Sequence, residues 1–460
     1  MKIEDTIVSI ATSPGVGAIG IIRISGREAF RISKILFKGK NKNFDDVKSH
    51  SVVYGWVIDP EDGHIVDEVL LSKMALPNTY TREDIVEINC HGSPIILKKI
   101  IDIVCILGAR VAEPGEFTKR AFLNGRIDLT QAEAVMDVIN SRADQGLKAS
   151  MRQLEGKLSS GIKPIRDRLI DMLSHIDASV DYPEYDIEQI SKEKIIEGCT
   201  FVKEKLEDVL STFDKGKILR EGLEVLILGV PNVGKSSLLN SLSGRNSAIV
   251  TNIPGTTRDI IQEDISVAGI QVNIIDTAGI RDTKDLVENI GVDRSLEYID
   301  KSDLILFMVD ASASLTADDY KIYERIKDKK SVLLINKMDK KNKENVEAIY
   351  EKFEDIIKIP MSVEQNIGFF ELENYIKDNF MLGNIKMNNE LILTNSRHKA
   401  FMVEAIKSII QALESINIGM PLDIISIDIQ NTADSLGHIT GESVKEDVLK
   451  EIFSRFCIGK

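Results

Sequence analysis

The sequence predicts a multidomain α/β protein with three kinds of domain: a small N-terminal α+β domain, an α-helical domain, and a domain with a parallel-type sheet and flanking helices inserted into the helical one. A chain of 460 residues is too long for one hydrophobic core, so two to four domains are expected. Short β-branched runs fill residues 1–118, whereas apolar residues recur at helical spacing in 119–216 and 383–460. Residues 217–382 separate these two helical stretches, which most simply pack together and close one helical unit.

Composition excludes several classes of protein. With 43% hydrophobic and 28% charged residues, the chain is globular and not disordered. Acidic residues stand where a signal peptide would have its apolar run, and the most apolar stretch, Leu304 to Val309, is too short to span a bilayer. The four cysteines form no C-x-x-C pair, which argues against a disulfide framework or a zinc site. We therefore expect a reduced, cytoplasmic protein with no membrane partner.

The net charge of −14 bears on nucleic-acid binding. A protein that grips nucleic acid over a broad face usually carries a basic excess. Any RNA contact of this chain must therefore rely on a local patch, on a partner, or on a few specific groups.

The first 118 residues contain five predicted strands, over 7–11, 19–24, 51–58, 69–75 and 85–89, and one helix over about 94–107. Gly15 to Gly20 formally match G-x-G-x-x-G, but a dinucleotide-binding loop needs a helix to open at its last glycine. The residues that follow, Ile21 to Ile24, look like a strand. We therefore interpret the motif as a glycine turn that joins two strands.

Two capping boxes are predicted in the first helical stretch. Thr130 with Glu133 would open one helix, and Ser141 with Asp144 would open another that runs to about residue 180. A further helix covers about 195–213, and 217–222 is the expected hinge into the inserted domain. Acidic residues interrupt a basic stripe here, which favours a solvated helix face over a phosphate-binding surface; the stripe consists of Lys148, Arg152, Lys157, Lys163, Arg166 and Arg168.

The C-terminal stretch is also predicted to be helical. Amphipathic segments cover about 395–418 and 422–432, and Ser443 with Glu446 would cap a last helix that ends near Arg455.

Four motifs follow one another in the central domain. They are Gly229-Val-Pro-Asn-Val-Gly-Lys-Ser236, Gly255-Thr-Thr-Arg-Asp259, Asp276-Thr-Ala-Gly279 and Asn336-Lys-Met-Asp339. One such motif can arise by chance, but an ordered set at domain-scale spacing is hard to obtain by accident. Together they are the elements of a P-loop domain that binds and hydrolyses GTP.

The first motif would hold the phosphates. An apolar strand over 223–228 leads into it, and a helix begins at Lys235, so backbone N–H groups of the loop and of the helix N-terminus point at the phosphates. Lys235 would reach the outer phosphates and the Ser236 hydroxyl would ligate Mg²⁺. The nucleotide-contacting positions are Asn232, Val233, Gly234, Lys235, Ser236 and Ser237.

The other motifs complete the site. Of Thr256 and Thr257 we favour Thr257 as the second Mg²⁺ ligand, and Asp276 would close the metal site through water. Gly279, which follows Thr277 and Ala278, is free to donate its N–H to the γ-phosphate.

Guanine recognition falls to Asn336 and Asp339, with Lys337 between them. A carboxylate accepts from the N1–H and amino group of guanine but repels the acceptor pattern of adenine, so GTP and not ATP is the ligand. For a fifth motif we expect Ser362-Ala and find Ser362-Val363, a departure that affects only a backbone contact.

Catalysis departs from the Ras pattern. Ile280 stands where Ras-like enzymes place the glutamine that orients water, and an aliphatic side chain cannot do so. Glu288 is the obvious carboxylate, although a loop glutamate is ordinarily a surface residue. The Asn232 amide oxygen and carbonyls of the 251–256 loop are able to ligate a monovalent cation. Such a cation would neutralise transition-state charge in place of an arginine finger.

These features resemble the MnmE (TrmE) family of tRNA-modifying GTPases. The likeness lies in Asn232, the 251–259 loop, Glu288 within Val-Glu-Asn-Ile-Gly291, and the terminal Phe456-Cys-Ile-Gly-Lys460. Pro114 to Arg126 and Asp128 to Ala134 also resemble the family, so the match runs the whole length of the chain.

The resemblance implies the cation and water sites. Asn232, with backbone oxygens of Thr251, Ile253 and Thr256, would hold K⁺, which promotes G-domain dimerisation and hydrolysis. Ser236 and Thr257 would hold Mg²⁺, and Glu288 would orient the attacking water.

The resemblance also implies a folate site and partners. The N-terminal domain would form a homodimer and bind 5-formyl- or 5,10-methylene-tetrahydrofolate, a one-carbon donor, through Arg23, Glu87, Arg126 and Lys460. An FAD-containing partner of the MnmG (GidA) type would complete a heterotetramer. The complex would install an aminomethyl or carboxymethylaminomethyl group at carbon 5 of the wobble uridine of certain tRNAs, gated by GTP hydrolysis.

Two alternatives stay open. A cysteine four residues from the end suggests prenylation, but Gly459 and Lys460 do not fit that signal. Cys457 is then either a structural thiol or, as the resemblance implies, a catalytic residue near the folate. The alternative function is a GTPase switch in ribosome assembly. It predicts a C-terminal RNA module such as a KH fold, whereas this C-terminus is predicted to be helical and of mixed charge.

Overall fold

The computed structural model describes residues 5–181, 192–245, 262–267, 269–276, 298–380, 391–457 and 459. The chain divides into two compact units. The first consists of Met1–Met136, Leu154–Arg166 and Ala433–Lys460, and the second of Asp137–Gln153 and Asp167–Thr432. No described helix is both long enough and apolar enough to cross a membrane.

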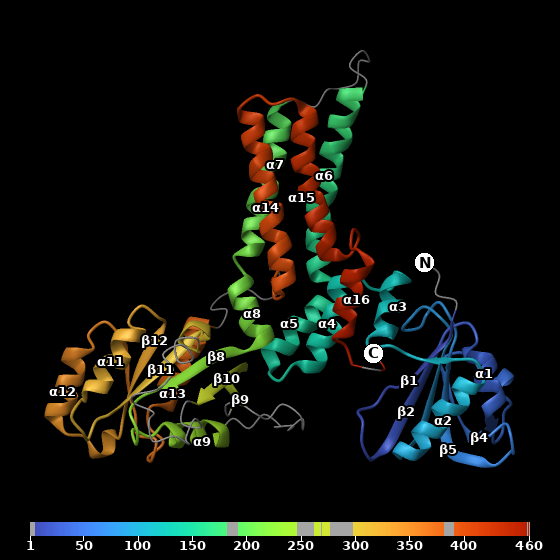
Figure 1. Cartoon of the computed structure of the whole chain (residues 1–460), viewed down its shortest axis with the longest axis horizontal. Coiled ribbons are helices and arrows are strands. Elements are labelled where there is room, and N and C mark those ends of the chain that lie inside the picture. Colours follow the sequence, from blue (N-terminus) through green and yellow to red (C-terminus); the bar gives the residue numbers. More distant parts are fainter. Residues whose placement is uncertain are drawn as a thin grey trace. The chain divides into compact units, whose positions relative to one another are not determined.

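The N-terminal residues build a seven-stranded sheet in the order β3-β4-β5-β6-β2-β1-β7 (Figure 1). Neighbouring strands are antiparallel except β1 and β7, which are parallel. The strands are β1 (Ile7–Ile10), β2 (Gly17–Ser25), β3 (Phe37–Gly39), β4 (Ser51–Ile58), β5 (Ile65–Met74), β6 (Ile85–Gly92) and β7 (Arg110–Val111). The five predicted strands are confirmed; β3 and β7 are too short to give an alternating pattern.

Two helices cover one face of this sheet. α1 (Ala29–Leu36) and α2 (Pro94–Ile106) both contact β6, and α2 also contacts β1, β2 and β5. Ile22, Ile24 and Ile88 are fully buried in the core between sheet and helices. On β4 and β5 other side chains stay exposed, among them Val52 at 62% and Leu70 at 48%. One face of the sheet is therefore packed, and apolar side chains remain open to solvent elsewhere on it.

The G-x-G-x-x-G segment is not a dinucleotide loop, because β2 and not a helix continues from Gly20. The expected turn is shorter than the motif: Gly17 and Gly20 are residues of β2, and only Gly15 belongs to the connection. A Cβ at Gly20 would lie 2.7 Å from the Leu97 side chain of α2. Glycine at this position therefore lets the helix pack closely on the strand.

Four helices follow the sheet: α3 (Glu116–Leu123), α4 (Leu129–Asn140), α5 (Asp144–Leu154) and α6 (Lys157–Asp181). The capping box predicted at Thr130 is wrong, because Asp128 is the cap. Asp128 Oδ1 accepts from the Gln131 N–H at 2.9 Å, and the Asp128 N–H donates to Gln131 Oε1 at 3.0 Å. A capping box is therefore present, but Asp128 and Gln131 form it, two residues earlier than predicted. The Thr130 hydroxyl donates to Asp128.

The long helix predicted from Ser141 is in fact two helices. Gly156, with a φ of 81°, separates α5 from α6. The Ser141 hydroxyl donates to the Asp137 carbonyl oxygen at 2.6 Å, so it binds to the last turn of the preceding helix, α4. The helical period alone does not reveal such a break, because a glycine is tolerated inside a helix.

The remaining helices come from both sides of the central domain. They are α7 (Lys192–Leu210), α8 (Phe213–Glu221), α14 (Ser396–Asn417), α15 (Leu422–Thr440) and α16 (Glu446–Ser454). α7 packs along α14 (Figure 1), which confirms that the two helical stretches meet. Each buries an apolar row: Ile195, Cys199, Val202 and Leu206 in α7, and Met402, Ala405, Ile409 and Ala412 in α14.

Three boundary predictions are wrong. Residues 217–221 of the expected hinge are the last residues of α8, and Gly222, with a φ of 91°, follows them. α15 continues to Thr440 instead of ending near residue 432. Ser443 does not cap the last helix: the N-cap is Lys445, without a side-chain hydrogen bond.

Two arginines of the basic stripe make protein contacts. Arg166 Nη1 pairs with Glu442 Oε2 at 2.6 Å, and the Arg168 guanidinium lies 4.6 Å from the centre of the Phe201 ring. These contacts agree with a structural, solvated helix face.

The central domain contains a six-stranded sheet in the order β13-β12-β11-β8-β10-β9. Only β9 and β10 are antiparallel, and the other neighbours are parallel. The strands are β8 (Leu223–Leu228), β9 (Gln262–Val267), β10 (Ile270–Asp276), β11 (Leu304–Asp310), β12 (Ser331–Asn336) and β13 (Ile357–Pro360).

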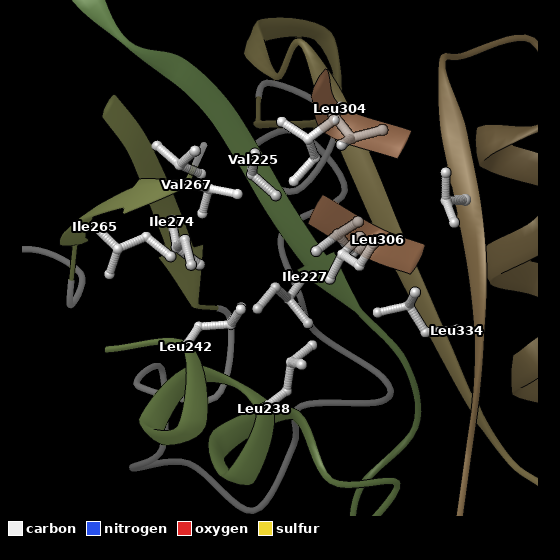
Figure 2. Close-up of a cluster of buried hydrophobic side chains, with 14 of the residues drawn as sticks. Val225, Ile227, Leu238, Leu242, Ile265, Val267, Ile274, Leu304, Leu306 and Leu334 are labelled. Atoms are coloured by element: carbon white, nitrogen blue, oxygen red, sulfur yellow. The ribbon is translucent and has the colours of Figure 1, made fainter. Parts of the chain in front are cut away.

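Helices cover both faces of this sheet: α9 (Lys235–Arg245), α11 (Ala317–Ile326), α12 (Lys343–Lys352) and α13 (Phe369–Phe380). Val225 and Ile227 pack in one core with Leu238 and Leu242 of α9 (Figure 2). Leu226, between them in the sequence, belongs to a second core with residues of α11 and α12. This two-sided burial of a mainly parallel sheet confirms the predicted fold class.

Candidate nucleotide site and N-terminal ligand cluster

The phosphate loop joins the end of β8 to the start of α9. Its backbone has positive φ at Gly229 (152°), Asn232 (67°) and Gly234 (108°). A Cβ would lie 2.4 Å from the Met308 carbonyl oxygen if added at Gly229, and 2.4 Å from Asn336 Nδ2 if added at Gly234. Glycine is therefore required at both positions, and the turn they allow brings successive N–H groups to the helix N-terminus, where an anion is favoured.

Lys235 folds back over this loop. Its Nζ donates to the carbonyl oxygens of Gly229 at 2.7 Å and Val230 at 2.9 Å. The ammonium group is thus held at the loop whose N–H groups would bind phosphate, and it needs only a small movement to meet a phosphate oxygen.

Several of the predicted residues lie at the carboxyl edge of the sheet. Asp310 at the end of β11 is opposite Asn336 at the end of β12, and the backbone of Asp276 ends β10 opposite Ile227. In open α/β sheets, ligands bind outside the carboxyl ends of the strands. The phosphate loop, Asp276 and the Asn336–Asp339 motif therefore share one edge.

Asn336 is buried and uses both ends of its side-chain amide. Nδ2 donates to the Val233 carbonyl oxygen at 2.8 Å, and Oδ1 accepts from the Val363 N–H at 3.1 Å. Asn336 therefore ties the phosphate loop to the Ser362-Val363 segment, and the departure at Val363 leaves this backbone contact intact.

Asp339 is the residue best placed to accept hydrogen bonds from a base. Its Oδ1 accepts from Ser362 Oγ at 2.5 Å, which holds the pKa of the Asp339 carboxyl below its usual range. The carboxylate is thus ionised and oriented by Ser362, while Oδ2 remains an acceptor.

Lys337 joins the two halves of the site. It has a φ of 60°, and its Nζ donates to the Asn232 carbonyl oxygen at 2.9 Å and to Asp310 Oδ2 at 2.6 Å. Burial alone would raise the pKa of Asp310, but hydrogen bonds from Lys337 and Ser312 outweigh it and lower that pKa. Sequence reasoning missed Asp310; its signal is an aspartate that ends a wholly apolar strand.

The residues predicted to hold the two cations and to contact the γ-phosphate and the attacking water are described only in part. Thr251, Ile253, Thr256, Thr257, Thr277, Ala278, Gly279 and Glu288 lie outside the described residues. Ser236 and Asn232 are described, and neither side chain has a hydrogen-bond partner among the described residues. A free hydroxyl in the first turn of α9 and a free amide oxygen in the loop fit ligands for hard cations.

A second group of predicted residues meets on the N-terminal sheet. Arg23 of β2 is opposite Glu87 of β6, and Arg23 Nε lies 2.8 Å from Glu87 Oε1. Arg23 Nη1 also donates to the Gly459 carbonyl oxygen at 3.3 Å. The fold thus brings residue 459 next to residue 23, although Lys460 itself lies outside the described residues.

Two aromatic rings complete this cluster. The Arg23 guanidinium lies 5.7 Å from the ring centre of Tyr80 and 5.6 Å from that of Phe117, and the Arg126 guanidinium lies 4.7 Å from Tyr80. The Tyr80 hydroxyl is within 2.9 Å of Thr118 Oγ1, which fixes the ring. Sequence reasoning missed both rings, because nothing in the local pattern reveals contacts made across the fold. We call Arg23, Tyr80, Glu87, Phe117 and Arg126 the N-terminal cluster.

Cys457 is exposed, and its carbonyl oxygen accepts from the Gly115 N–H at 3.4 Å. Cys90 and Cys199 differ from it: burial raises the pKa of their thiols to about 11 and about 12, so both stay protonated and unreactive. Solvent access is one requirement for a reactive thiol, and Cys457 meets it; its catalytic role stays a prediction.

The fold and the central site define a P-loop GTPase whose N-terminal part also carries the cluster of two arginines, a glutamate and two aromatic rings. A family model of the MnmE helical domain matches residues 129–457, and a model of the GTP-binding protein TrmE N-terminus matches residues 6–126. The chain is 53% identical over 457 residues to the tRNA modification GTPase MnmE of Acetivibrio thermocellus, covering 99% of each chain. Identity is 48% to that of Alkaliphilus oremlandii and 47% to that of Clostridioides difficile, each over 100% of both chains.

The chain therefore belongs to the MnmE (TrmE) family of tRNA modification GTPases. It is an enzyme that hydrolyses GTP, and the predicted family is confirmed.

Proposed function

We propose that this GTPase acts with an FAD-containing partner of the MnmG (GidA) type to modify carbon 5 of the wobble uridine of certain tRNAs. The observation that carries the proposal is the presence, in one chain, of a guanine-nucleotide site and of the N-terminal cluster beside Gly459. A GTPase switch alone does not need the second site. GTP hydrolysis would gate the modification and not supply its chemistry.

The N-terminal cluster suits a tetrahydrofolate. A pterin edge presents N–H donors that match the Glu87 carboxylate, and the glutamate tail of a folate carries carboxylates that match guanidinium groups. Among the described residues, Arg126 has no carboxylate partner; its Nη1 donates only to the Tyr80 carbonyl oxygen at 3.4 Å. When bound, 5-formyl- or 5,10-methylene-tetrahydrofolate would supply one carbon, held by Arg23, Glu87, Arg126 and Lys460, with Cys457 nearby.

At the central site the chain would hold the phosphates with the loop N–H groups and Lys235, and recognise guanine with Asp339. Ser236 and Thr257 would hold Mg²⁺, with Asp276 acting through water. Asn232 and the oxygens of Thr251, Ile253 and Thr256 would hold K⁺. Both cations would neutralise charge on the phosphates. Glu288 would orient the attacking water, which Ile280 cannot do.

The proposal includes the assembly. The N-terminal domain (1–118) would form the homodimer, the helical segments 119–216 and 383–460 would form one domain, and 217–382 would be the GTPase domain. Two chains and two copies of the partner would make the heterotetramer, in the cytoplasm. A net charge of −14 fits a complex whose partner makes much of the tRNA contact.

GTP turnover in K⁺ and in Na⁺ at equal ionic strength tests the cation mechanism, with Asn232→Ala alongside. Strong stimulation by K⁺ that the variant loses supports cation-assisted hydrolysis. Equal, slow rates in both salts would overturn it.

Binding of 5-formyl-tetrahydrofolate, with Arg126→Ala as the variant, separates the proposal from a ribosome-assembly switch. That alternative needs no folate and predicts a C-terminal RNA module. The described residues 391–457 instead form α14, α15 and α16, so no observation favours it.

A further inference from the structure

A hollow with several lysines lies beside the edge strand β3 of the N-terminal sheet. Its volume is about 290 Å³, and it is lined by Lys40, Asn41, Lys42, Val47, Lys48 and Ser51 to Tyr54. We call these residues the basic hollow. Its strand residues belong to β3 and β4 or their flanks, whereas Arg23 lies in β2 and Glu87 in β6.

The lysines of the basic hollow carry charges that no described carboxylate neutralises. Among the described residues, no carboxylate lies within ion-pairing distance of Lys40, Lys42 or Lys48; the pair formed in this part of the chain is Lys34 with Asp45, at 2.5 Å. Three lysines that line one hollow concentrate positive charge there, and an anion bound among them would reduce the repulsion between their ammonium groups. Such a concentration runs against the charge of −14 of the whole chain.

Aromatic rings adjoin these lysines. Lys40 Nζ lies 5.4 Å from the centre of the Tyr54 ring, and the Tyr54 and Trp56 rings are 5.4 Å apart in a T-shaped arrangement. The Tyr54 hydroxyl donates to Glu68 at 2.7 Å, which fixes the ring. Both rings project from the same side of β4, and Lys38 of β3 stands directly opposite Trp56.

We propose that the basic hollow, with Tyr54 and Trp56, binds a single-stranded segment of the substrate tRNA. Lysines would contact phosphates and a ring would stack on an unpaired base, the combination that single-stranded RNA requires. The inference rests on the proposed function for the identity of the RNA. It would supply a local basic patch through which so acidic a chain can contact RNA.

The first test replaces the three lysines together, Lys40→Ala, Lys42→Ala and Lys48→Ala, in the full chain. The probe is an unmodified tRNA transcript, and binding is measured by filter retention over about 50 to 200 mM KCl. Because this variant can no longer neutralise three phosphates, the slope of log K against log salt should shrink by about 2, and the affinity at the lowest salt should fall at least about tenfold.

A matched control removes the same charge from the basic stripe: Lys148→Ala, Lys157→Ala and Lys163→Ala. This variant should bind the transcript as wild type does. An equal loss in both triple variants would mean that only net charge matters, and would overturn a localised site. GTP turnover and folate binding should be unchanged in both, which shows that each variant is folded.

A second test separates stacking from charge. Trp56→Leu should weaken binding about tenfold while leaving the salt slope unchanged, because it removes a ring and no charge. Inorganic phosphate should compete for the lysines only weakly; complete displacement by phosphate would reveal an anion site that does not need RNA, and would overturn the proposal.

Two outcomes distinguish this inference from the proposed function. If wild-type protein modifies tRNA and the triple lysine variant does so with the same KM, the basic hollow is not an RNA contact, and the proposed function stands. If wild-type protein neither binds nor modifies tRNA, both fail. Loss of partner binding with tRNA affinity intact would assign the hollow to an acidic protein surface and overturn the RNA site.

Discussion

The central site and the N-terminal cluster are built in opposite ways. The central site is made by backbone: Gly229 and Gly234 shape the loop, and Asn336 and Lys337 bind to its carbonyl oxygens. The N-terminal cluster is made by side chains that converge from positions 23, 80, 87, 117 and 126, together with the carbonyl of residue 459. The residues that form a backbone site stand close together in the sequence, in short motifs. The residues of a side-chain site are far apart in the sequence, and the fold of the whole domain brings them together.

The N-terminal cluster rests on a buried ionic network. Arg120 is fully buried and lies 2.9 Å from Glu116, 3.2 Å from Glu83 and 2.7 Å from Asp5. Glu83 also accepts from Ser25, and Ser25 is within 2.7 Å of Thr81, the neighbour of Tyr80. The network therefore holds the loop that carries the Tyr80 ring.

The largest expected effect is on this network. Arg120→Met removes the fully buried cation of the network: Glu83 loses its ion-pair partner, and Glu116 keeps only Arg110. The change should lower the free energy of unfolding of the N-terminal domain by about 3–5 kcal/mol. The single tryptophan, Trp56, lies in β4, so its fluorescence in a denaturant titration measures this domain. Arg31→Met, which breaks an exposed pair with Glu28, should cost less than about 1 kcal/mol. GTP turnover by Arg120→Met should stay close to that of wild type under conditions in which the protein is folded. A loss of turnover as large as the loss of N-terminal stability would mean that the central site depends on the N-terminal network.

Acid should also weaken the N-terminal domain. Burial alone would raise the pKa of Glu116, but bonds from Arg110, the Glu113 N–H and Arg120 lower it to about 2, from 4.5 in the unfolded chain. The folded value is depressed, so the stabilisation is complete above pH 4.5 and is lost as the pH falls toward 2, in total roughly 3 kcal/mol. Unfolding free energies measured by Trp56 fluorescence across this range should show that loss, and Glu116→Gln should remove it.

Lys235→Ala tests the central site alone. Without the ammonium group that reaches the phosphates, kcat/KM for GTP should fall about 100- to 1000-fold. Folate binding should stay as in wild type, because no residue of the N-terminal cluster is touched. Lys327→Ala, which removes an exposed lysine paired with Glu324, is the matched control and should leave turnover unchanged. A loss of folate affinity in Lys235→Ala would contradict the separation.

The smallest effect is expected at Tyr80. Tyr80→Leu removes the ring that both Arg23 and Arg126 contact, and should raise the Kd for 5-formyl-tetrahydrofolate about tenfold. Tyr80→Phe keeps the ring and removes only the hydrogen bond with Thr118, so its Kd should change less than about threefold. Equal losses in the two variants would assign the effect to the hydroxyl and not to the ring.

The same contrast explains what the sequence could predict. The predicted strand over 223–228 and the predicted helix start at Lys235 match the structure. An apolar run followed by a glycine-rich phosphate loop is compatible with one local structure, a strand, a loop and a helix in that order. The caps at Thr130 and Ser443 are wrong, because several polar residues compete for one helix end and tertiary contacts decide among them. Arg23, Glu87, Arg126 and Lys460 were predicted from the family resemblance alone. Asp310 has a signal in the sequence, as the aspartate that ends an apolar strand, whereas no local pattern indicates that Tyr80, Phe117 and the Arg120 network come together.

One side chain gives the central site a further property. The buried Asn336 amide spans the phosphate loop and the segment after β13, so neither can be displaced without the other. Guanosine and pyrophosphate, offered as two separate fragments, would then not bind independently, because a fragment that shifts one of the two linked segments also shifts the other. The asparagine thereby links the loop that faces the phosphates to the segment that carries Ser362, the partner of Asp339, so the two ends of the nucleotide would meet one connected framework.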